Sequence, residues 1–577
     1  MRPYVVVMRN SHEVAIRELI IRCMSQMVAG RVGNIKSGWK SMFMVFTTAA
    51  SDSQRSIVVL AFETIERIMR QHFNHIVETD STAFTDCVNC LVAFTNSRCS
   101  PEVSLNAIAF LRFCALKLAE GALGNLEVAA GAPAPDGAGA ATATPARVGA
   151  TFFTDADAHL YLWFPLLVGL SELTFDSRRD VRHSALEVLF DMLKFHGAAF
   201  SPAFWDRVFD KILFPIFDAV RAEGLDAGRA RGEAAPSDSP AGAAFAAAAA
   251  AHDSEVDAWL FETCSHCLHL IVDLFAQFFA SVSPLLPRLL ALLQQLALRP
   301  HEALSASGVA ALSRLVVAAG PLFDASHWGA VVDALSTTLR DAAPPERVAA
   351  LAAPAAPGGA AWLSAAAEAR CAASTQLALL QAAGDVLLQH AADLPADAAS
   401  RLTRSLADAH ERARAVNADA ALRAALRAAA AAAAAECGDA PPALRLAALL
   451  PDPPLLALEV AAGSARLQAS TQLLGAAPPG EAADAERRLA ELVVELLAGA
   501  GGQAQPGEAE ARAPLVCAAL RTAWENFSAP AFARAADLLL PASMALLRAE
   551  GVHASVRDAL ATLIERRLFP PSHLTRE

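Results

Sequence analysis

The apolar positions of Val181–Trp205 recur, without a gap, in Leu304–Trp328, at an offset of 123 residues. Within each copy they return every three or four residues, which is the period of a helix with one buried stripe. The corresponding apolar pairs are Val181/Leu304, Leu186/Val309, Met192/Leu315 and Leu193/Val316, and the identical pairs are Ser184/Ser307, Leu189/Leu312, Gly197/Gly320, Phe200/Phe323 and Trp205/Trp328. The pattern predicts two equivalent helical units.

Each copy also carries a glycine after its helix and a tryptophan eight residues further on. Gly197 and Gly320 stand where a helix end in the left-handed conformation favours a residue without a Cβ. Trp205 and Trp328 are expected to lie at the start of the next helix and to pin it back on the first. The sequence therefore predicts helical hairpins with a buried ring at the turn.

A weaker repeat lies upstream, at an offset of 46 residues. Spacings of 46, and of 123 taken as three units of about 41, fit the period of HEAT-like helical pairs. No alternating strand pattern of useful length occurs, so the predicted fold is all-α, a HEAT/armadillo-like helical solenoid. The matching positions are Ile57/Val103, Ala61/Ala107 and Ile65/Leu111.

Two segments rich in Ala, Gly and Pro interrupt this pattern, and the texture changes to Ala/Leu/Arg helices near residue 341. Such segments contain too few large apolar residues to form a core, so they are predicted to be disordered linkers. The predicted organisation is helical repeats 1–120, a linker 121–157, repeats 158–221, a linker 222–255, repeats 256–340, Ala-rich helices 341–440, and C-terminal repeats with linkers 441–577.

Charge is distributed unevenly along the 577 residues. The net charge is −13, which argues against a general nucleic-acid-binding protein. Residues 1–70 contain ten Lys or Arg against five Asp or Glu, a net +5, which leaves −18 for the rest. These basic residues either lie on solvated helix faces or mark a contact with an acidic partner or an anionic membrane leaflet.

The composition bears on membrane insertion and on the redox compartment of the protein. No stretch of about 20 uninterrupted apolar residues occurs, which predicts no transmembrane segment. The ten cysteines are scattered rather than arranged as a disulfide framework, which indicates a reducing compartment.

The segment Gly33–Ser41 approaches a phosphate-binding loop, but Trp39 stands between the second glycine and the lysine. The lysine must follow that glycine directly to reach the phosphates. A turn between two repeat helices, with Trp39 packed inward, is the favoured interpretation. Three basic residues of this region, Arg31, Lys36 and Lys40, are the candidate contacts with a partner or membrane.

Two cysteine pairs, Cys87/Cys90 and Cys264/Cys267, raise the question of zinc. A tetrahedral site needs both pairs close together, and low-complexity sequence separates them. Buried cysteines that act as small hydrophobic residues are the favoured interpretation. No catalytic, cofactor-binding or metal-binding residue is predicted, and no cofactor.

Four blocks of the sequence resemble one family. Together they resemble the region downstream of the catalytic domain in the large brefeldin A-inhibited guanine nucleotide-exchange factors for Arf GTPases, in the plant and green-algal branch. A fainter similarity returns from Arg512 onward. The blocks are Ile16–Val28 with Asn34–Lys40, Thr85–Arg98 with Leu105–Cys114, Trp163–Leu167 through Phe214–Asp218, and Asp257–Leu260 onward to Trp328.

The resemblance implies a cytoplasmic protein bound peripherally to membranes of the Golgi and trans-Golgi network, in vesicle-mediated protein transport. In that family the downstream repeats are regulatory, and a separate domain performs exchange through a Phe-Arg-Leu-Pro-Gly-Glu-Ala loop. Pro479–Ala482 and Pro506–Ala509 match only the last four residues of that loop, in predicted linkers. The resemblance therefore implies a C-terminal fragment without exchange activity.

The predicted function is the non-catalytic regulatory C-terminal part of a large Arf exchange factor. Its expected partners are an Arf-family GTPase, an anionic membrane surface and the exchange domain that this chain lacks. The alternative is a generic HEAT-repeat trafficking scaffold with no direct Arf contact. A third hypothesis, exchange by this chain alone, is expected to fail.

Overall fold

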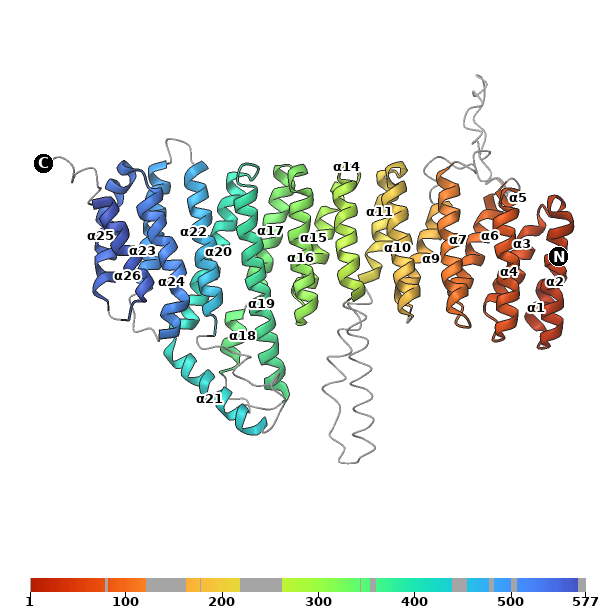
Figure 1. Ribbon diagram of the computed structural model, residues 1–577, viewed down its shortest axis with the longest axis horizontal. Helices are drawn as coiled ribbons and strands as arrows, with labels where there is room; N and C mark the ends of the chain where they lie inside the picture. The colour runs from red at the N-terminus through yellow and green to blue at the C-terminus, as the bar shows by residue number, and fades with distance from the viewer. Residues whose placement is uncertain are drawn as a thin grey trace, which may run out of the picture. The chain divides into compact units, whose positions relative to one another are not determined.

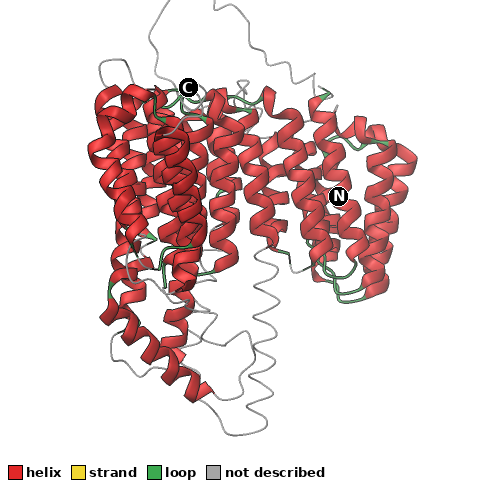
Figure 2. Cartoon of the chain, turned by 60° about the vertical axis from the view of Figure 1, so that its left-hand side comes forward, coloured by secondary structure: helices red, strands yellow, loops and turns green. Residues whose placement is uncertain are grey.

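The computed structural model describes residues 2–77, 81–120, 162–176, 178–217, 262–342, 344–352, 360–437, 454–476, 482–499, 506–549 and 551–568. The predicted linkers 121–157 and 222–255 lie outside these residues. The chain divides into two compact units, unit 1 (Met1–Leu285) and unit 2 (Leu286–Glu577). Every regular element of the described residues is a helix (Figure 2), which confirms the all-α fold class.

Unit 1 is a double row of helices (Figure 1). The elements are α1 (Arg2–Asn10), α2 (Val14–Arg31), η1 (Val32–Asn34), α3 (Gly38–Ala50), α4 (Arg55–Gln71), α5 (Phe73–Val77), α6 (Ser81–Thr95), α7 (Pro101–Ala119), α9 (Phe164–Glu172), η3 (Leu173–Phe175), α10 (Arg179–His196), η4 (Gly197–Ala199), α11 (Pro202–Val208), η5 (Phe209–Leu213), a helix over Glu262–Gln277, α14 (Phe279–Val282) and η6 (Ser283–Leu285).

The helices of unit 1 pack mainly with their counterparts in the next pair. In one row α2 packs on α4, α4 on α7 and α7 on α10, and in the other α1 packs on α3, α3 on α6 and α6 on α9. Each helix also packs on its partner across the pair, as α6 does on α7. This is the two-row arrangement in which each repeat buries its apolar face against its neighbours.

Polar contacts reinforce the junction between α7 and α10. Arg178, just before α10, donates to the Ser97 carbonyl and to the Ser104 hydroxyl, both at 2.9 Å. The Asp176 carboxylate accepts a 2.7 Å hydrogen bond from the same guanidinium and holds it in place. One arginine therefore satisfies polar groups of two successive repeats.

Unit 2 continues the same type of pairing. Its elements are α15 (Leu286–Ala297), α16 (Glu302–Ala319), η7 (Gly320–Leu322), α17 (Ala325–Asp341), α18 (Pro344–Ala350), α19 (Ala360–Gln389), α20 (Ala396–Ala418), α21 (Ala420–Cys437), α22 (Leu456–Ala476), α23 (Ala482–Ala498), α24 (Pro506–Arg521), η10 (Thr522–Asn526), α25 (Ala529–Arg548) and α26 (Ala554–Leu568). In one row α16 packs on α19, α19 on α22, α22 on α24 and α24 on α26, while α15, α17 and α20 form the other row.

The repeat predicted from the sequence is confirmed. Val181–Trp205 forms α10, η4 and the start of α11, and Leu304–Trp328 forms α16, η7 and the start of α17. Trp205 and Trp328 are both fully buried. The weaker upstream repeat also holds, because its matching positions are buried on α4 and α7.

The predicted role of the two glycines is wrong. Gly197 has a φ of −60° and Gly320 a φ of −48°, so neither adopts the left-handed conformation. A Cβ on Gly197 would lie 2.5 Å from Trp205 Cζ2, and a Cβ on Gly320 would lie 2.8 Å from His390 Cε1. Glycine is needed here because a ring packs against the backbone, not because of the backbone torsion.

Three helices of the described residues are long and apolar enough to cross a membrane, by length and composition only: Glu302–Leu322, Ala365–Gln389 and Ala529–Arg548. Of the most apolar window of each, 61%, 61% and 28% respectively is buried within the protein. The first two are thus mainly core helices of unit 2. The expected absence of a transmembrane segment stays a prediction.

Candidate functional site

The turn between α2 and α3 holds the basic residues singled out in the sequence. Arg31 ends α2, Lys36 follows η1 with a φ of +40°, and α3 begins at Gly38. Trp39 is buried and stacks on Phe43 with ring centroids 5.7 Å apart. The turn is thus a connection between repeat helices with Trp39 packed inward, as predicted.

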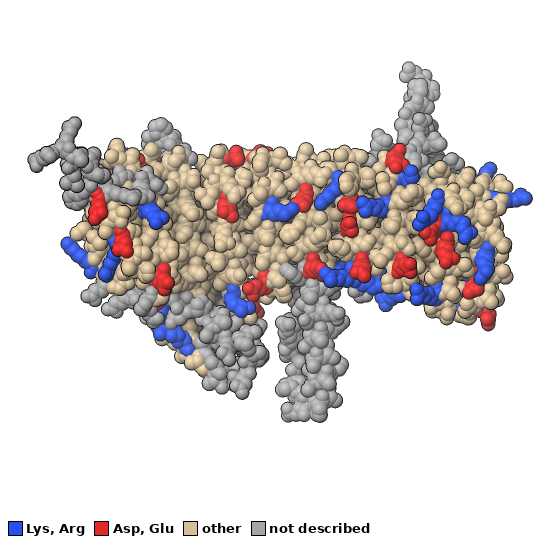
Figure 3. Space-filling model, viewed as in Figure 1, with Lys and Arg blue, Asp and Glu red and all other residues tan. Residues whose placement is uncertain are grey.

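Part of the basic excess of residues 1–70 is neutralised locally. Arg17 pairs with Asp52 at 3.2 Å, and Arg70 pairs with Glu66 at 2.8 Å. Arg31, Lys36 and Lys40 are all exposed, and Arg31 and Lys36 form no ion pair with any residue that the structure describes. On the face shown in Figure 3, Lys and Arg alternate with Asp and Glu over unit 1.

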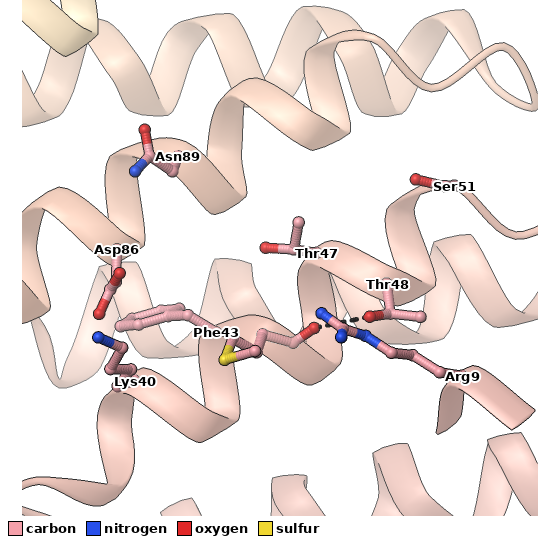
Figure 4. A pocket seen from close by; sticks show the side chains of 9 residues that line it. Arg9, Lys40, Phe43, Thr47, Thr48, Ser51, Asp86 and Asn89 are labelled. Atoms are coloured by element: carbon pink, nitrogen blue, oxygen red, sulfur yellow. Dashed lines mark hydrogen bonds between the residues drawn. The ribbon is translucent and has the colours of Figure 1, made fainter. Parts of the chain in front are cut away.

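Lys40 belongs to a cavity of about 460 Å³ between α1, α3 and α6 (Figure 4). The apolar part of its wall is the buried ring of Phe43 and the side chain of Met44, which is 37% exposed. The polar groups are supplied by Arg9 of α1, by Lys40, Thr47 and Thr48 of α3, by Ser51 just after α3, and by Asp86 and Asn89 of α6.

The polar groups of this cavity lie at two ends. At one end the Lys40 amino group points toward the Asp86 carboxylate (Figure 4). At the other end the Arg9 guanidinium lies beside Thr48 (Figure 4), whose hydroxyl donates to the Met44 carbonyl at 2.9 Å. The sequence had indicated Lys40 but not Arg9, because only the packing of α1 on α3 brings Arg9 to the same cavity.

The cysteine pairs are core residues. Cys87 lies 3.5 Å from Met69 Sδ, and Cys87, Cys90, Cys264 and Cys267 are all buried. Burial raises the pKa of the Cys90 thiol to about 12, which keeps it protonated and unreactive. No group of three or more potential metal ligands occurs in the described part of the chain. The burial of all four side chains agrees with the interpretation as small hydrophobic residues.

A buried polar network in unit 2 was not predicted. Arg512 of α24 donates to both oxygens of Glu459 on α22, each at 3.0 Å, and to Glu508 at 3.3 Å. Glu459 also accepts from the Asn417 amide of α20 at 2.7 Å, and Glu508 accepts from Arg423 of α21 at 2.6 Å. The available signal was a set of polar residues within otherwise Ala- and Leu-rich helices.

This network also decides the role of Pro506–Ala509, one of the two partial matches to the exchange loop. We expected these residues in a linker, but they form the first turn of α24. The Glu508 side chain is only 8% exposed and is held by two arginines. It is therefore a structural ion-pair residue. The other partial match, Pro479–Ala482, falls largely outside the described residues.

Family models match three parts of the chain. The model described as "Mon2/Sec7/BIG1-like, HDS" matches residues 1–67, the BIG2 C-terminal domain matches residues 374–565, and the C-terminal region of Mon2 protein matches residues 144–238. The first contains the turn with Arg31, Lys36 and Lys40, and the second contains the buried network of unit 2.

Curated relatives agree with these matches. Brefeldin A-inhibited guanine nucleotide-exchange protein 2 of Arabidopsis thaliana is 47% identical over 356 residues, which are 60% of this chain and 19% of the relative. Protein 3 of the same plant is 49% identical over 337 residues, 58% of this chain and 18% of the relative. The chain is therefore similar to brefeldin A-inhibited exchange proteins. The match to the BIG2 C-terminal domain indicates that the similarity includes the C-terminal region of such proteins.

Relatives from animals are more distant. Brefeldin A-inhibited guanine nucleotide-exchange protein 1 of Homo sapiens is 28% identical over 344 residues, 59% of this chain and 16% of the relative. The chain thus corresponds to about a fifth of the length of the exchange proteins it matches. Among solved structures, importin beta gives a TM-score of 0.20 at 8% identity, covering 98% of this chain and 74% of that chain. That similarity is too low to carry an argument.

Proposed function

We propose that this chain is the non-catalytic regulatory region of a large Arf exchange factor, and that it supports Arf activation at Golgi and trans-Golgi network membranes. The supporting observation is the 47–49% identity to two plant exchange proteins over more than half of the chain. The stacked helical pairs fit this role because such stacks present extended surfaces to partners.

The turn between α2 and α3 is the proposed contact with an Arf-family GTPase or with the anionic surface that carries it. Arg31, Lys36 and Lys40 are exposed there, within the part that matches the HDS family model. Each basic residue near an anionic leaflet contributes about 1 kcal/mol, so three residues assist recruitment without anchoring the chain. Contact with the catalytic exchange domain of the same protein is a further part of the proposal.

Flotation of the full chain with anionic liposomes, with and without Arf loaded with GTP, tests this proposal. We expect binding that is strongest with both components and that falls in the variant Arg31→Glu/Lys36→Glu/Lys40→Glu. Arg404→Glu/Arg521→Glu/Arg548→Glu is the control, because it changes the charge equally at exposed positions of unit 2. Equal loss in both variants, or no binding under either condition, contradicts the proposal.

A nucleotide-release assay tests the non-catalytic part of the proposal. We expect the 577-residue chain to leave the rate of nucleotide release from Arf unchanged. Acceleration by the chain alone would show that exchange activity resides in these repeats. Recovery of coat or adaptor proteins in pull-downs, but never Arf, would favour the alternative role as a trafficking scaffold.

A further inference from the structure

The cavity between α1, α3 and α6 has the composition of a peptide-binding groove. Its volume of about 460 Å³ combines apolar contact surface from Phe43 and Met44 with polar groups of three helices. Ligand sites commonly have this size and this mixture. We propose that the groove binds an acidic peptide segment of a partner protein, with Arg9 and Lys40 pairing its carboxylates.

Charge complementarity selects an acidic ligand. Arg9 is exposed and forms no ion pair with any residue in the described parts of the chain. The surrounding segment of residues 1–70 carries a net charge of +5, while the rest of the chain carries −18. Because complementary charge sets specificity and accelerates association, this groove favours carboxylates over other peptide side chains.

The remaining groups favour a peptide over a phosphate. A peptide main chain presents both N–H donors and carbonyl acceptors. The Asn89 amide and the Thr47 hydroxyl can each donate and accept hydrogen bonds, so they match a main chain. The groups also line a hollow between helices (Figure 4), whereas a lipid surface contacts protruding side chains.

The geometry of α3 sets the spacing of the carboxylates. Lys40 and Thr48, beside which Arg9 lies, are eight residues apart on α3, which is about 12 Å along the helix axis. An extended chain advances about 3.3 Å per residue, so the two carboxylates stand about four residues apart. This inference requires neither Arf nor a membrane, and it therefore stands or fails apart from the proposed function.

Fluorescence anisotropy with the full chain tests it. The probe is a labelled extended peptide of about ten residues with two glutamates about four residues apart, and the reference probe carries lysines in their place. We expect binding of the acidic peptide alone, weakening as salt rises. Arg9→Glu lowers the affinity about tenfold or more, and Arg9→Glu/Lys40→Glu abolishes binding.

Two further variants distinguish binding in the groove from general electrostatic attraction to the basic surface. Arg55→Glu makes the same charge change at an exposed position of α4 outside the cavity, and we expect it to leave the affinity nearly unchanged. Asn89→Ala is expected to lower the affinity while leaving its salt dependence unchanged, because it removes only main-chain hydrogen bonds. Thermal melting of each variant confirms that it is folded.

Several results overturn the inference. These are an acidic peptide that does not bind, a lysine peptide that binds equally well, or equal losses in Arg9→Glu and Arg55→Glu. Displacement of the peptide by inorganic phosphate at constant ionic strength would assign the groove to a phosphate ligand. Binding of anionic vesicles that depends on Arg9, without peptide binding, would assign it to a membrane.

Discussion

The helical pairs of unit 1 and the α20–α24 segment of unit 2 share one architecture but fill their interiors differently. The first pairs of unit 1 bury large rings, such as Trp39, Phe43 and Phe94. The α20–α24 segment buries mainly Leu and Ala, and it adds the nearly fully buried carboxylates of Glu459 and Glu508.

The difference concerns how each region fixes the register of its helices. A large ring fits only one hole, so shape alone sets the alignment of two helices. Alanine-rich surfaces are smoother and specify alignment weakly. A slip of α24 against α22 would leave Glu459 and Arg512 buried without their partners, at a cost of about 3–5 kcal/mol. We infer that shape sets the register in the first region and charge pairing sets it in the second.

Loss of a ring is expected to have the largest effect. Trp205→Ala and Trp328→Ala should each lower the free energy of unfolding by about 3–5 kcal/mol. Trp205 donates to the Gly197 carbonyl at 3.2 Å, whereas Trp328 Nε1 is buried without a hydrogen-bond partner. Trp205→Phe should therefore cost more than Trp328→Phe. Urea denaturation followed by circular dichroism measures both, and an unchanged Trp328→Ala variant would remove the basis of the repeat.

Removal of one partner from the buried network should have the next largest effect on the free energy of unfolding. Arg512→Met leaves Glu459 without its arginine partner and Glu508 with only Arg423, which costs about 3 kcal/mol. Arg487→Met breaks an exposed pair with Glu491, and it should cost no more than about 0.5 kcal/mol. The same denaturation experiment compares them. Equal effects would mean that burial does not matter and that the network does not set the register.

Replacing a glycine by alanine should change the free energy of unfolding by an intermediate amount, in opposite directions at Gly197 and Gly30. Gly197→Ala places a Cβ against rings of Trp205 and Phe278 and should destabilise by about 1–3 kcal/mol. A Cβ on Gly30 of α2 meets nothing within 4 Å, so Gly30→Ala should stabilise by up to about 1 kcal/mol. Melting temperatures of both variants check this. A stabilising Gly197→Ala would show that the ring contact is not the reason for glycine.

The smallest expected effect is on the pH dependence of stability, to which His410 of the α20–α24 segment contributes. Burial lowers the pKa of His410 on α20, where Glu495, Arg466, Glu459 and Arg414 are the nearest charges. The folded state thus favours the neutral ring, and its contribution is present above the unfolded pKa of about 6.5 and lost as pH falls below it. His410→Gln should reduce the loss of melting temperature between pH 7.5 and 5.5.

The exposed His12→Gln is the control for this experiment, because it removes a histidine from the loop before α2. Its melting temperature should fall with pH as that of the unchanged protein does. If His410→Gln shows the same fall as His12→Gln, then His410 does not contribute to the acid sensitivity.

Hydrophobic periodicity alone determined the class of fold. The stripes of Val181–Trp205 and Leu304–Trp328 predicted helical pairs with buried tryptophans, and the interruption at Trp39 predicted a repeat turn in place of a phosphate loop. These predictions held because helix period and local turn chemistry are encoded by neighbouring residues. The four resembling blocks led to the family for the same reason, since they are contiguous stretches of sequence.

Only the tertiary structure decided the features made by residues far apart in the chain. Arg9 reaches the cavity of Lys40 because α1 packs on α3. A Cβ on Gly197 would meet not only the nearby Trp205 but also Phe278, which is 81 residues further along the chain. Glu459 and Arg512 meet across 53 residues. A one-dimensional pattern records which helix faces are apolar, but not which partners those faces meet.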